Sequence, residues 1–129
     1  MTKTETAKRF LKRVFVRTNY SAYYEIDGKK DGEFRSWYKN GQCCGHCYYK
    51  NDELDGEYRM WYEDGRPLRH CHLINGKRDG ESKSWYGNGQ LTEHCYYKNG
   101  EYDGEYKWWY KDGQLKTHCY YENGVKING

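Results

Sequence analysis

The chain has 129 residues, enough for one ordinary domain, and only 36% of them are hydrophobic. Leu, Ile, Val and Phe are scarce, which excludes a conventional two-layer aliphatic core, whereas 16 Tyr, 5 Trp and 3 Phe exclude a disordered chain. The net charge of +3 is uneven, because residues 1–17 carry six basic residues against Glu5, a net +5, while the other 16 basic and 18 acidic residues give −2.

The N-terminal segment, residues 1–19, is predicted to cap the array that follows it. Thr2 and Glu5 have capping-box spacing, and apolar residues then recur at helical intervals, which favours a helix. A strand is the alternative, because Phe10 and Val14 fall in the register of later aromatic residues. The basic residues of this segment also suit a membrane-surface helix or a nucleic-acid arm.

Residues 1–17 lack the apolar run of an export signal, and no stretch approaches the roughly 18 apolar residues of a membrane span. We therefore expect a cytoplasmic protein whose 6 cysteines stay reduced rather than forming disulfides.

From residue 20 onward the sequence repeats every 24 residues without insertion. Asp-Gly pairs, Trp-Tyr pairs and His-Cys pairs all keep this period, which indicates a repeat array. The predicted units are a half repeat and four full repeats, at 20–30, 31–54, 55–78, 79–102 and 103–129.

Each repeat is predicted to form two short strands, as "EYKWWY" and "QLKTHCYY" illustrate. The intervening "KDGQ" predicts a hairpin with a two-residue type I′ turn at Asp112-Gly113, with a three-residue turn and glycine bulge as the alternative. The "ENG" that follows turns the chain into the next unit. Successive hairpins at this spacing predict an antiparallel meander in which one repeat advances about 9.6 Å.

These motifs resemble the MORN repeat family, in particular its antitoxin-type variant, over residues 20–129. The resemblance rests on a "W-Y-x-[ND]-G-x-L" core that recurs in register, with departures at Cys43, Pro67 and Ser82. It implies an all-β fold, an elongated single-layer sheet of stacked hairpins, and non-catalytic work in protein interaction, scaffolding or membrane association. Tyr-rich arrays of this type are similar to those of large DNA viruses of amoebae, which implies a host-cytoplasmic or virion location.

The two-residue turn predicts which side chains share a face of the last repeat. Directly opposed residues lie on the same face, which pairs Tyr110 with Leu115 and Trp108 with Thr117. We expect the core face to carry Tyr106, Trp108, Tyr110, Leu115, Cys119 and Tyr121. The opposite face then carries Glu105, Lys107, Trp109, Lys116, His118 and Tyr120, a mixture of rings and charges suited to binding.

The recurring His-Cys pairs are predicted to be structural, with no metal or other cofactor. Equivalent cysteines one repeat apart are too distant for a disulfide or a shared metal ion, and adjacent residues of a strand point to opposite faces. The weak metal candidate is "CCGHC", with Cys43, Cys44, His46 and Cys47. There Cys44 and His46 are expected on one face and Cys43 and Cys47 on the other, so that the four diverge.

The function predicted from these features is a non-enzymatic scaffold that binds a protein partner through an aromatic groove. The predicted groove residues are Trp37, Trp61, Trp85, Trp109, Tyr48, Tyr96 and Tyr120. The alternatives are rigidification by a stacked Trp column, binding of anionic lipid through residues 1–17, and antitoxin-like inhibition of a partner. A homodimer is expected through the C-terminal edge, at Leu115, Thr117, Cys119 and Tyr121, because an unpaired strand edge attracts another chain.

Overall fold

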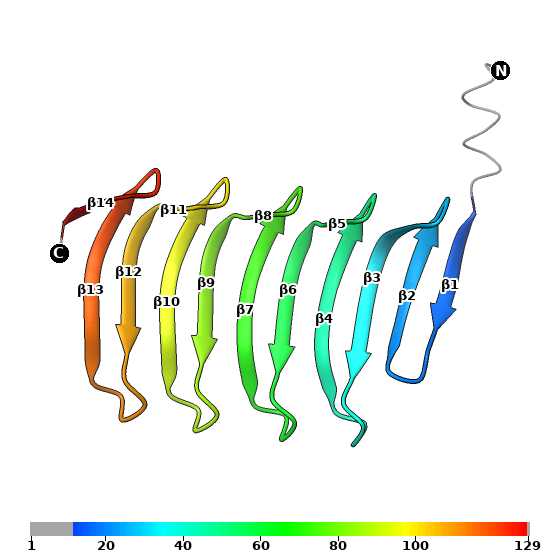
Figure 1. The fold of residues 1–129 in the computed structure, drawn as a ribbon, viewed down its shortest axis with the longest axis horizontal. Coiled ribbons are helices and arrows are strands. Elements are labelled where there is room, and N and C mark those ends of the chain that lie inside the picture. The colour runs from blue at the N-terminus through cyan, green and yellow to red at the C-terminus, as the bar shows by residue number, and fades with distance from the viewer. Residues whose placement is uncertain (1–11, 129) are drawn as a thin grey trace, which may run out of the picture.

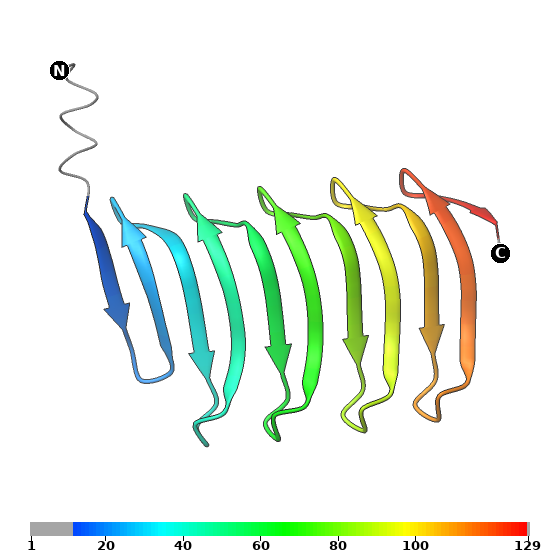
Figure 2. The same cartoon turned by 180° about the vertical axis from the view of Figure 1, so that it is seen from behind.

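The computed structural model describes residues 12–128, and within them every regular element is a β-strand. All 14 strands belong to one open antiparallel sheet in which neighbours in sequence are neighbours in space (Figure 1). Seen from behind, the sheet remains a single layer with β1 and β14 at opposite ends (Figure 2). The predicted all-β meander of stacked hairpins is therefore confirmed.

The first three strands precede or open the first full repeat: β1 (Arg13–Arg17), β2 (Ser21–Ile26) and β3 (Lys29–Trp37). Two long strands then come from each repeat, joined by short strands at the far end of the sheet. The long strands are β4 (Cys43–Lys50), β6 (Gly56–Trp61), β7 (Pro67–Ile74), β9 (Gly80–Trp85), β10 (Leu91–Lys98), β12 (Gly104–Trp109) and β13 (Leu115–Glu122). The short ones are β5 (Glu53–Leu54), β8 (Lys77–Arg78) and β11 (Glu101–Tyr102), and β14 (Val125–Asn128) ends the sheet.

The hairpin loop that follows each Trp-Tyr pair has three residues. In the last repeat, the Gly113 N–H donates to Tyr110 O and the Tyr110 N–H donates to Gln114 O. Only Gly113 has a positive φ, of 90°, so the predicted two-residue type I′ turn is wrong and the three-residue alternative is present. Asp112 instead accepts the Gln114 N–H through its carboxylate at 2.9 Å, which stabilises the loop.

A β-bulge in β13 restores the predicted strand pairing on the side of the bulge away from the turn. Trp109 pairs with Leu115 and Trp108 with Thr117, so Lys116 is the extra residue of a bulge. The predicted pairing of Tyr110 with Leu115 is therefore wrong, whereas the pairing of Trp108 with Thr117 is confirmed. The bulge moves Leu115 to the Trp109 side and brings the Lys116 ammonium over the Trp108 and Tyr110 rings, opposite to the predicted placement.

Turns with two positive φ values occur at the other end of each repeat, where the sequence has Asn51-Asp52 in the first full repeat and Asn-Gly in the other three. Asn99 and Gly100 have φ values of 53° and 86°, and Asn123 and Gly124 have 50° and 83°. These are the φ signs of a type I′ turn, and they close tight hairpins such as β10–β11. The next residue pair, Asp103-Gly104, then leads into the following long strand, where Gly104 adopts a φ of 116°.

The sheet has two chemically different faces. The Tyr–Cys face carries the columns Phe34/Tyr58/Ser82/Tyr106, Cys47/Cys71/Cys95/Cys119 and Tyr49/Leu73/Tyr97/Tyr121. The Trp–His face carries the columns Trp37/Trp61/Trp85/Trp109, His46/His70/His94/His118 and Tyr48/His72/Tyr96/Tyr120. The buried core lies on the Tyr–Cys face, where Cys95 is 0% exposed and packs with Tyr106, Cys119 and neighbouring Tyr rings.

Neighbouring repeats are joined by side-chain hydrogen bonds that recur every 24 residues. The hydroxyl of Tyr38 donates to the backbone oxygen of Trp61 at 2.6 Å, and Tyr62 does the same to Trp85. Tyr86 repeats the bond to Trp109 at 2.7 Å. At the other end of the sheet, the glycine N–H of each Asn-Gly turn donates to a backbone oxygen of the preceding repeat, as Gly76 does to Leu54 and Gly100 to Arg78. Hydrogen bonds at both ends of the strands therefore join each repeat to the next.

The N-terminal cap is a strand where the structure describes it. Residues 13–17 form β1 and pair with β2, so the predicted helix is wrong for them, while residues 1–11 lie outside the described part. Phe15 packs against Tyr24 with ring centroids 5.3 Å apart, and Arg13 forms an ion pair of 3.0 Å with Asp31. β-Branched Val14 and Val16 favour the extended conformation over the helix.

Candidate functional site

The four tryptophans of the predicted groove lie on one face and are all half-buried. Trp61 and Trp85 line one small pocket, and Trp85 and Trp109 line a second, of about 420 Å³, whose floor includes Leu91. Among residues 12–128, the ring contacts join Tyr, Phe and His but no two Trp. Successive indoles are therefore separated by slots rather than stacked on each other.

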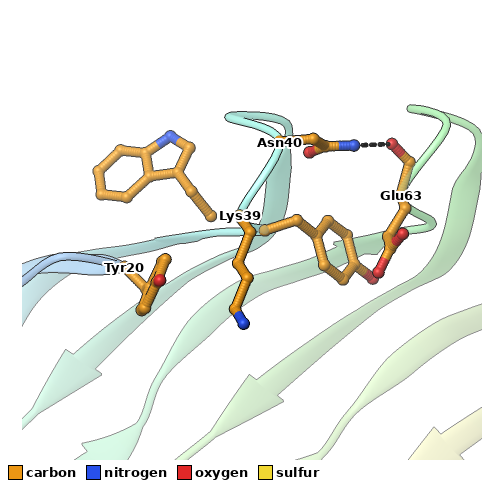
Figure 3. Close-up of a pocket in the computed structure, with 6 residues that line it drawn as sticks. Tyr20, Lys39, Asn40 and Glu63 are labelled. Carbon is orange, nitrogen blue, oxygen red and sulfur yellow. Dashed lines mark hydrogen bonds between the residues drawn. The ribbon is translucent and has the colours of Figure 1, made fainter.

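A larger pocket of about 600 Å³ lies where the first full repeat meets the half repeat (Figure 3). It is lined by Tyr20, Trp37, Tyr38, Lys39, Asn40 and Glu63. The Asn40 side-chain amide donates to the Glu63 backbone oxygen at 3.0 Å and fixes one rim. The Arg17 guanidinium lies 5.2 Å from the Trp37 ring centre, so the first indole of the column is in contact with a cation.

The predicted tyrosines Tyr48, Tyr96 and Tyr120 lie on the same face, each beside the histidine two residues before it. The ring of Tyr48 is 5.3 Å from that of His46, and equivalent distances recur for the other two pairs. Tyr48 and Tyr120 are 37% and 39% exposed, so their rings are available to a partner. In the second repeat His72 takes this position, so the tyrosine column has a gap.

A continuous row of basic residues and histidines crosses eight strands between the Trp and Tyr columns. In order of pairing the row is Arg35, His46, Arg59, His70, Lys83, His94, Lys107 and His118. A column of glutamates runs beside it, and in two repeats the His Nε2 lies 2.9 Å from the carboxylate, at Glu81 and Glu105. Each repeat thus places one Arg or Lys, one His and one Glu together.

These contacts lower the pKa of the carboxyl groups. The pKa of Glu57 is lowered mainly by a hydrogen bond from Arg59. The pKa values of Glu81 and Glu105 are lowered mainly by hydrogen bonds from His94 and His118. The glutamates are therefore ionised at neutral pH and balance the charge of the neighbouring Arg or Lys.

The "CCGHC" segment differs from its prediction. A bulge makes Cys44 the extra residue between the pairs Trp37–Cys43 and Ser36–Gly45, and the Cys44 thiol donates to the Ser36 hydroxyl at 3.0 Å. Cys44 therefore lies on the Tyr–Cys face with Cys47, and the predicted placement of Cys43 and Cys44 is reversed. The six cysteines are free, and within residues 12–128 no three His, Cys, Asp or Glu side chains gather as a metal site would require.

Burial makes the column cysteines poor nucleophiles. It raises the pKa of Cys47 to about 11, and burial with the nearby Glu93 carboxylate raises that of Cys95 to about 12. Both thiols are protonated at neutral pH, and the thiolate is the reactive form.

The predicted dimer-edge residues all lie in β13, at the end of the array. Leu115 is 49% exposed, whereas Cys119 is buried against Tyr106. β14 folds back onto this strand but pairs only with Tyr120 to Glu122. The outer edge of β13 before Tyr120 has no strand beside it among the described residues.

Sequence reasoning missed two half-buried arginines on the Tyr–Cys face. Arg69 and Arg78 line one pocket of about 150 Å³ together with Tyr58 and Cys71. The available signal was a departure from the repeat, because the positions equivalent to Arg69 hold Gly45, Glu93 and Thr117.

The fold and these surfaces define a β-hairpin repeat array with one packed face and one slotted face. A family model described as "MORN repeat variant" matches residues 30–51, 54–75, 78–99 and 102–123. The chain belongs to the MORN repeat family, whose repeats are in general non-catalytic scaffolds for interaction with proteins or membranes. The predicted likeness to arrays of amoebal viruses stays a prediction.

Comparison with curated proteins gives no match. Among solved structures, the chain is similar to one described as "Glycosylation Associate Protein (Gap123) complex from Streptococcus agalactiae", with a TM-score of 0.43 and 13% identity. The similarity covers 77% of this chain and 19% of that one. Within residues 12–128 there is also no helix long and apolar enough to cross a membrane.

Proposed function

We propose that the protein is a non-catalytic scaffold that binds a protein partner across its Trp–His face. The observation that carries the proposal is the series of slots between successive indoles, at Trp61–Trp85 and Trp85–Trp109. Each slot accepts one apolar side chain, and a partner that fills several gains one such contact per repeat. Aromatic residues with half-buried rings are frequent hot spots of interfaces.

The electrostatics of the face favour a protein partner over a polyanion. Each Arg or Lys of the central row has a glutamate of its own repeat beside it, as Arg59 has Glu57 and Lys107 has Glu105. With neutral histidines the row carries little net charge, so a nucleic acid would gain little from it. Matched hydrogen bonds to exposed Glu and His groups instead suit the polar rim of a protein interface.

Substitution in the Trp column tests this proposal. Trp61→Ala is expected to weaken capture of the partner at least about tenfold, because it removes a wall from the slot shared with Trp85. Trp108→Ala is the matched control, since Trp108 is 39% exposed on the opposite face. Quantitative mass spectrometry of proteins captured by wild type and both variants measures the difference. A lower melting temperature for Trp61→Ala with capture unchanged would assign the indoles to stability alone.

Association with anionic lipid through residues 1–17 is the alternative. Its support is weaker, because Arg13 is paired with Asp31 and Arg17 lies over the Trp37 ring. Flotation with vesicles containing anionic lipid, with and without residues 1–17, separates the two functions. Antitoxin-like inhibition of a partner is a further alternative, and it would use the same Trp–His face.

We also propose that two chains join through the C-terminal edge. The support is the open edge of β13 before Tyr120, beside the exposed side chains of Tyr110 and Leu115. Pairing of this edge with itself gives a closed dimer of about twice the length. Leu115→Lys is expected to make the protein monomeric in light scattering, because edge lysines block strand pairing. A wild-type monomer at tens of micromolar contradicts the dimer.

A further inference from the structure

The Tyr–Cys face carries three departures from the repeat in the second and third full repeats. Ser82 stands where the other repeats have Phe34, Tyr58 and Tyr106, and it is 1% exposed. Arg78 is the last residue of the short strand β8, and Arg69 lies in the long strand β7 before it. The equivalents of Arg78 are Lys30, Leu54 and Tyr102. No other repeat places two arginines on this face.

Both arginines lie at one pocket. The pocket holds about 150 Å³ and is lined by Leu54, Tyr58, Arg69, Cys71, Leu73 and Arg78. Burial raises the pKa of the Cys71 thiol, and the Arg78 and Arg69 guanidinium groups act against this rise. The same two groups also lower the pKa of Tyr58, against a larger rise from burial and from the nearby cysteines. Both guanidinium groups therefore act electrostatically on Tyr58 and Cys71, which line the same pocket.

These charges lack a carboxylate partner in the described part of the chain. None of the ion pairs among residues 12–128 includes Arg69 or Arg78. Arg78 donates one N–H to the neutral Tyr97 hydroxyl at 2.9 Å. Burial acts to lower the pKa of Arg78, but the hydrogen bond with Tyr97 and, to a smaller extent, the charge of Glu93 raise it. The Glu93 carboxylate accepts a hydrogen bond from the Tyr106 hydroxyl at 3.0 Å and is not in an ion pair with Arg78. A half-buried cation in apolar surroundings is stabilised by a counter-anion, and guanidinium binds oxyanions through several N–H groups at once.

We propose that Arg69 and Arg78 form a binding site for a phosphate-type oxyanion on the Tyr–Cys face. Two guanidinium groups that form no ion pair among residues 12–128 match the charge of a phosphate dianion, and the rings and aliphatic side chains around them form an apolar wall. Tyr58 contributes only its ring, because its hydroxyl already donates to the Met60 sulfur at 3.3 Å. The pocket lies on the Tyr–Cys face, and Arg69 also lines the pocket between Trp61 and Trp85.

The oxyanion has two possible sources, a small free phosphate and a phosphorylated side chain of a protein. Isothermal titration with inorganic phosphate, a phosphoserine peptide and its unphosphorylated form distinguishes them, against potassium chloride at equal ionic strength. Tighter binding of the phosphopeptide than of phosphate assigns the site to a modified protein. Equal or weaker binding of the phosphopeptide assigns it to a free anion.

Each arginine is best replaced by the residue that another repeat has at the equivalent position, because that residue is compatible with the fold and removes the charge. Arg69→Thr copies Thr117, and Arg78→Leu copies Leu54. Each is expected to weaken phosphate binding at least about tenfold, because each removes charge-assisted hydrogen bonds. Lys111→Gln, in the exposed hairpin loop of the last repeat, also removes one positive charge and is expected to bind as wild type does. Circular dichroism checks folding, and Arg69→Thr decides alone if Arg78→Leu is unfolded. Absence of phosphate binding beyond chloride, or equal binding by Arg69→Thr, overturns the proposal.

Discussion

Removal of a single hydroxyl tests how the repeats hold together. Tyr62→Phe deletes the hydrogen bond of 2.6 Å from the Tyr62 hydroxyl to the backbone oxygen of Trp85 in the next repeat. The ring and its packing remain, so the change isolates the bond. A hydrogen bond of this kind contributes about 0.5–1.5 kcal/mol net, and somewhat more where the acceptor is left partly buried. We expect the free energy of unfolding to fall by about 1 kcal/mol.

The array supplies its own control at the C-terminal end. Tyr110 occupies the same position as Tyr62, but within residues 12–128 no further repeat lies beside it, and the residue is 50% exposed. Tyr110→Phe is therefore expected to leave the stability of the monomer unchanged within about 0.5 kcal/mol.

Urea unfolding followed by Trp fluorescence measures both variants at a protein concentration that keeps the chain monomeric. In a domain of this size, the expected loss for Tyr62→Phe corresponds to a fall in melting temperature of about 3–5 °C. Removal of the equivalent hydroxyls of Tyr38 and Tyr86 as well is expected to add nearly independently, because the three bonds lie one repeat apart. Equal stability of Tyr62→Phe and Tyr110→Phe would refute the view that these bonds couple the repeats.

Two further predictions concern titratable groups. Cys47 and Cys95 are buried, and their pKa values are raised to about 11 and about 12, so a thiol reagent at pH 8 is expected to reach and label them only when the protein unfolds. Rapid labelling of both in the folded protein would contradict this. Because the pKa of Glu81 is lowered in the folded state, chiefly by the His94 hydrogen bond, its contribution to stability is present above its unfolded pKa of about 4.3 and is lost as the pH falls through its folded pKa. The difference in melting temperature between Glu81→Gln and wild type should therefore be present at pH 6 and shrink as the pH falls through the folded pKa of Glu81, and a difference that does not change with pH would exclude the linkage.

The sequence by itself determined the architecture, because its strand-forming and turn-forming residues recur with a fixed period. A 24-residue repeat with strand-forming aromatic runs and glycine turns can bury its apolar side chains only by stacking identical hairpins. The same alternation placed the small cysteines, such as Cys95 and Cys119, in the packed face, where they are buried. Trp108 and Thr117 pair as the hairpin register predicted.

The tertiary structure decided which face several functional side chains occupy. A bulge adds one residue to a strand and reverses the side of every residue between it and the turn, which a period-2 argument cannot anticipate. This is why Lys116 and Cys44 lie on the Tyr–Cys face and Leu115 lies beside Trp109.

Contacts between repeats were likewise decided only in three dimensions. The Tyr62 hydroxyl meets a backbone oxygen 23 residues away, and a backbone atom leaves no signature in the sequence. The pocket that holds Arg69 and Arg78 arises because substitutions in different columns become neighbours when the strands pair. The sequence shows each departure singly, whereas the folded sheet brings them together.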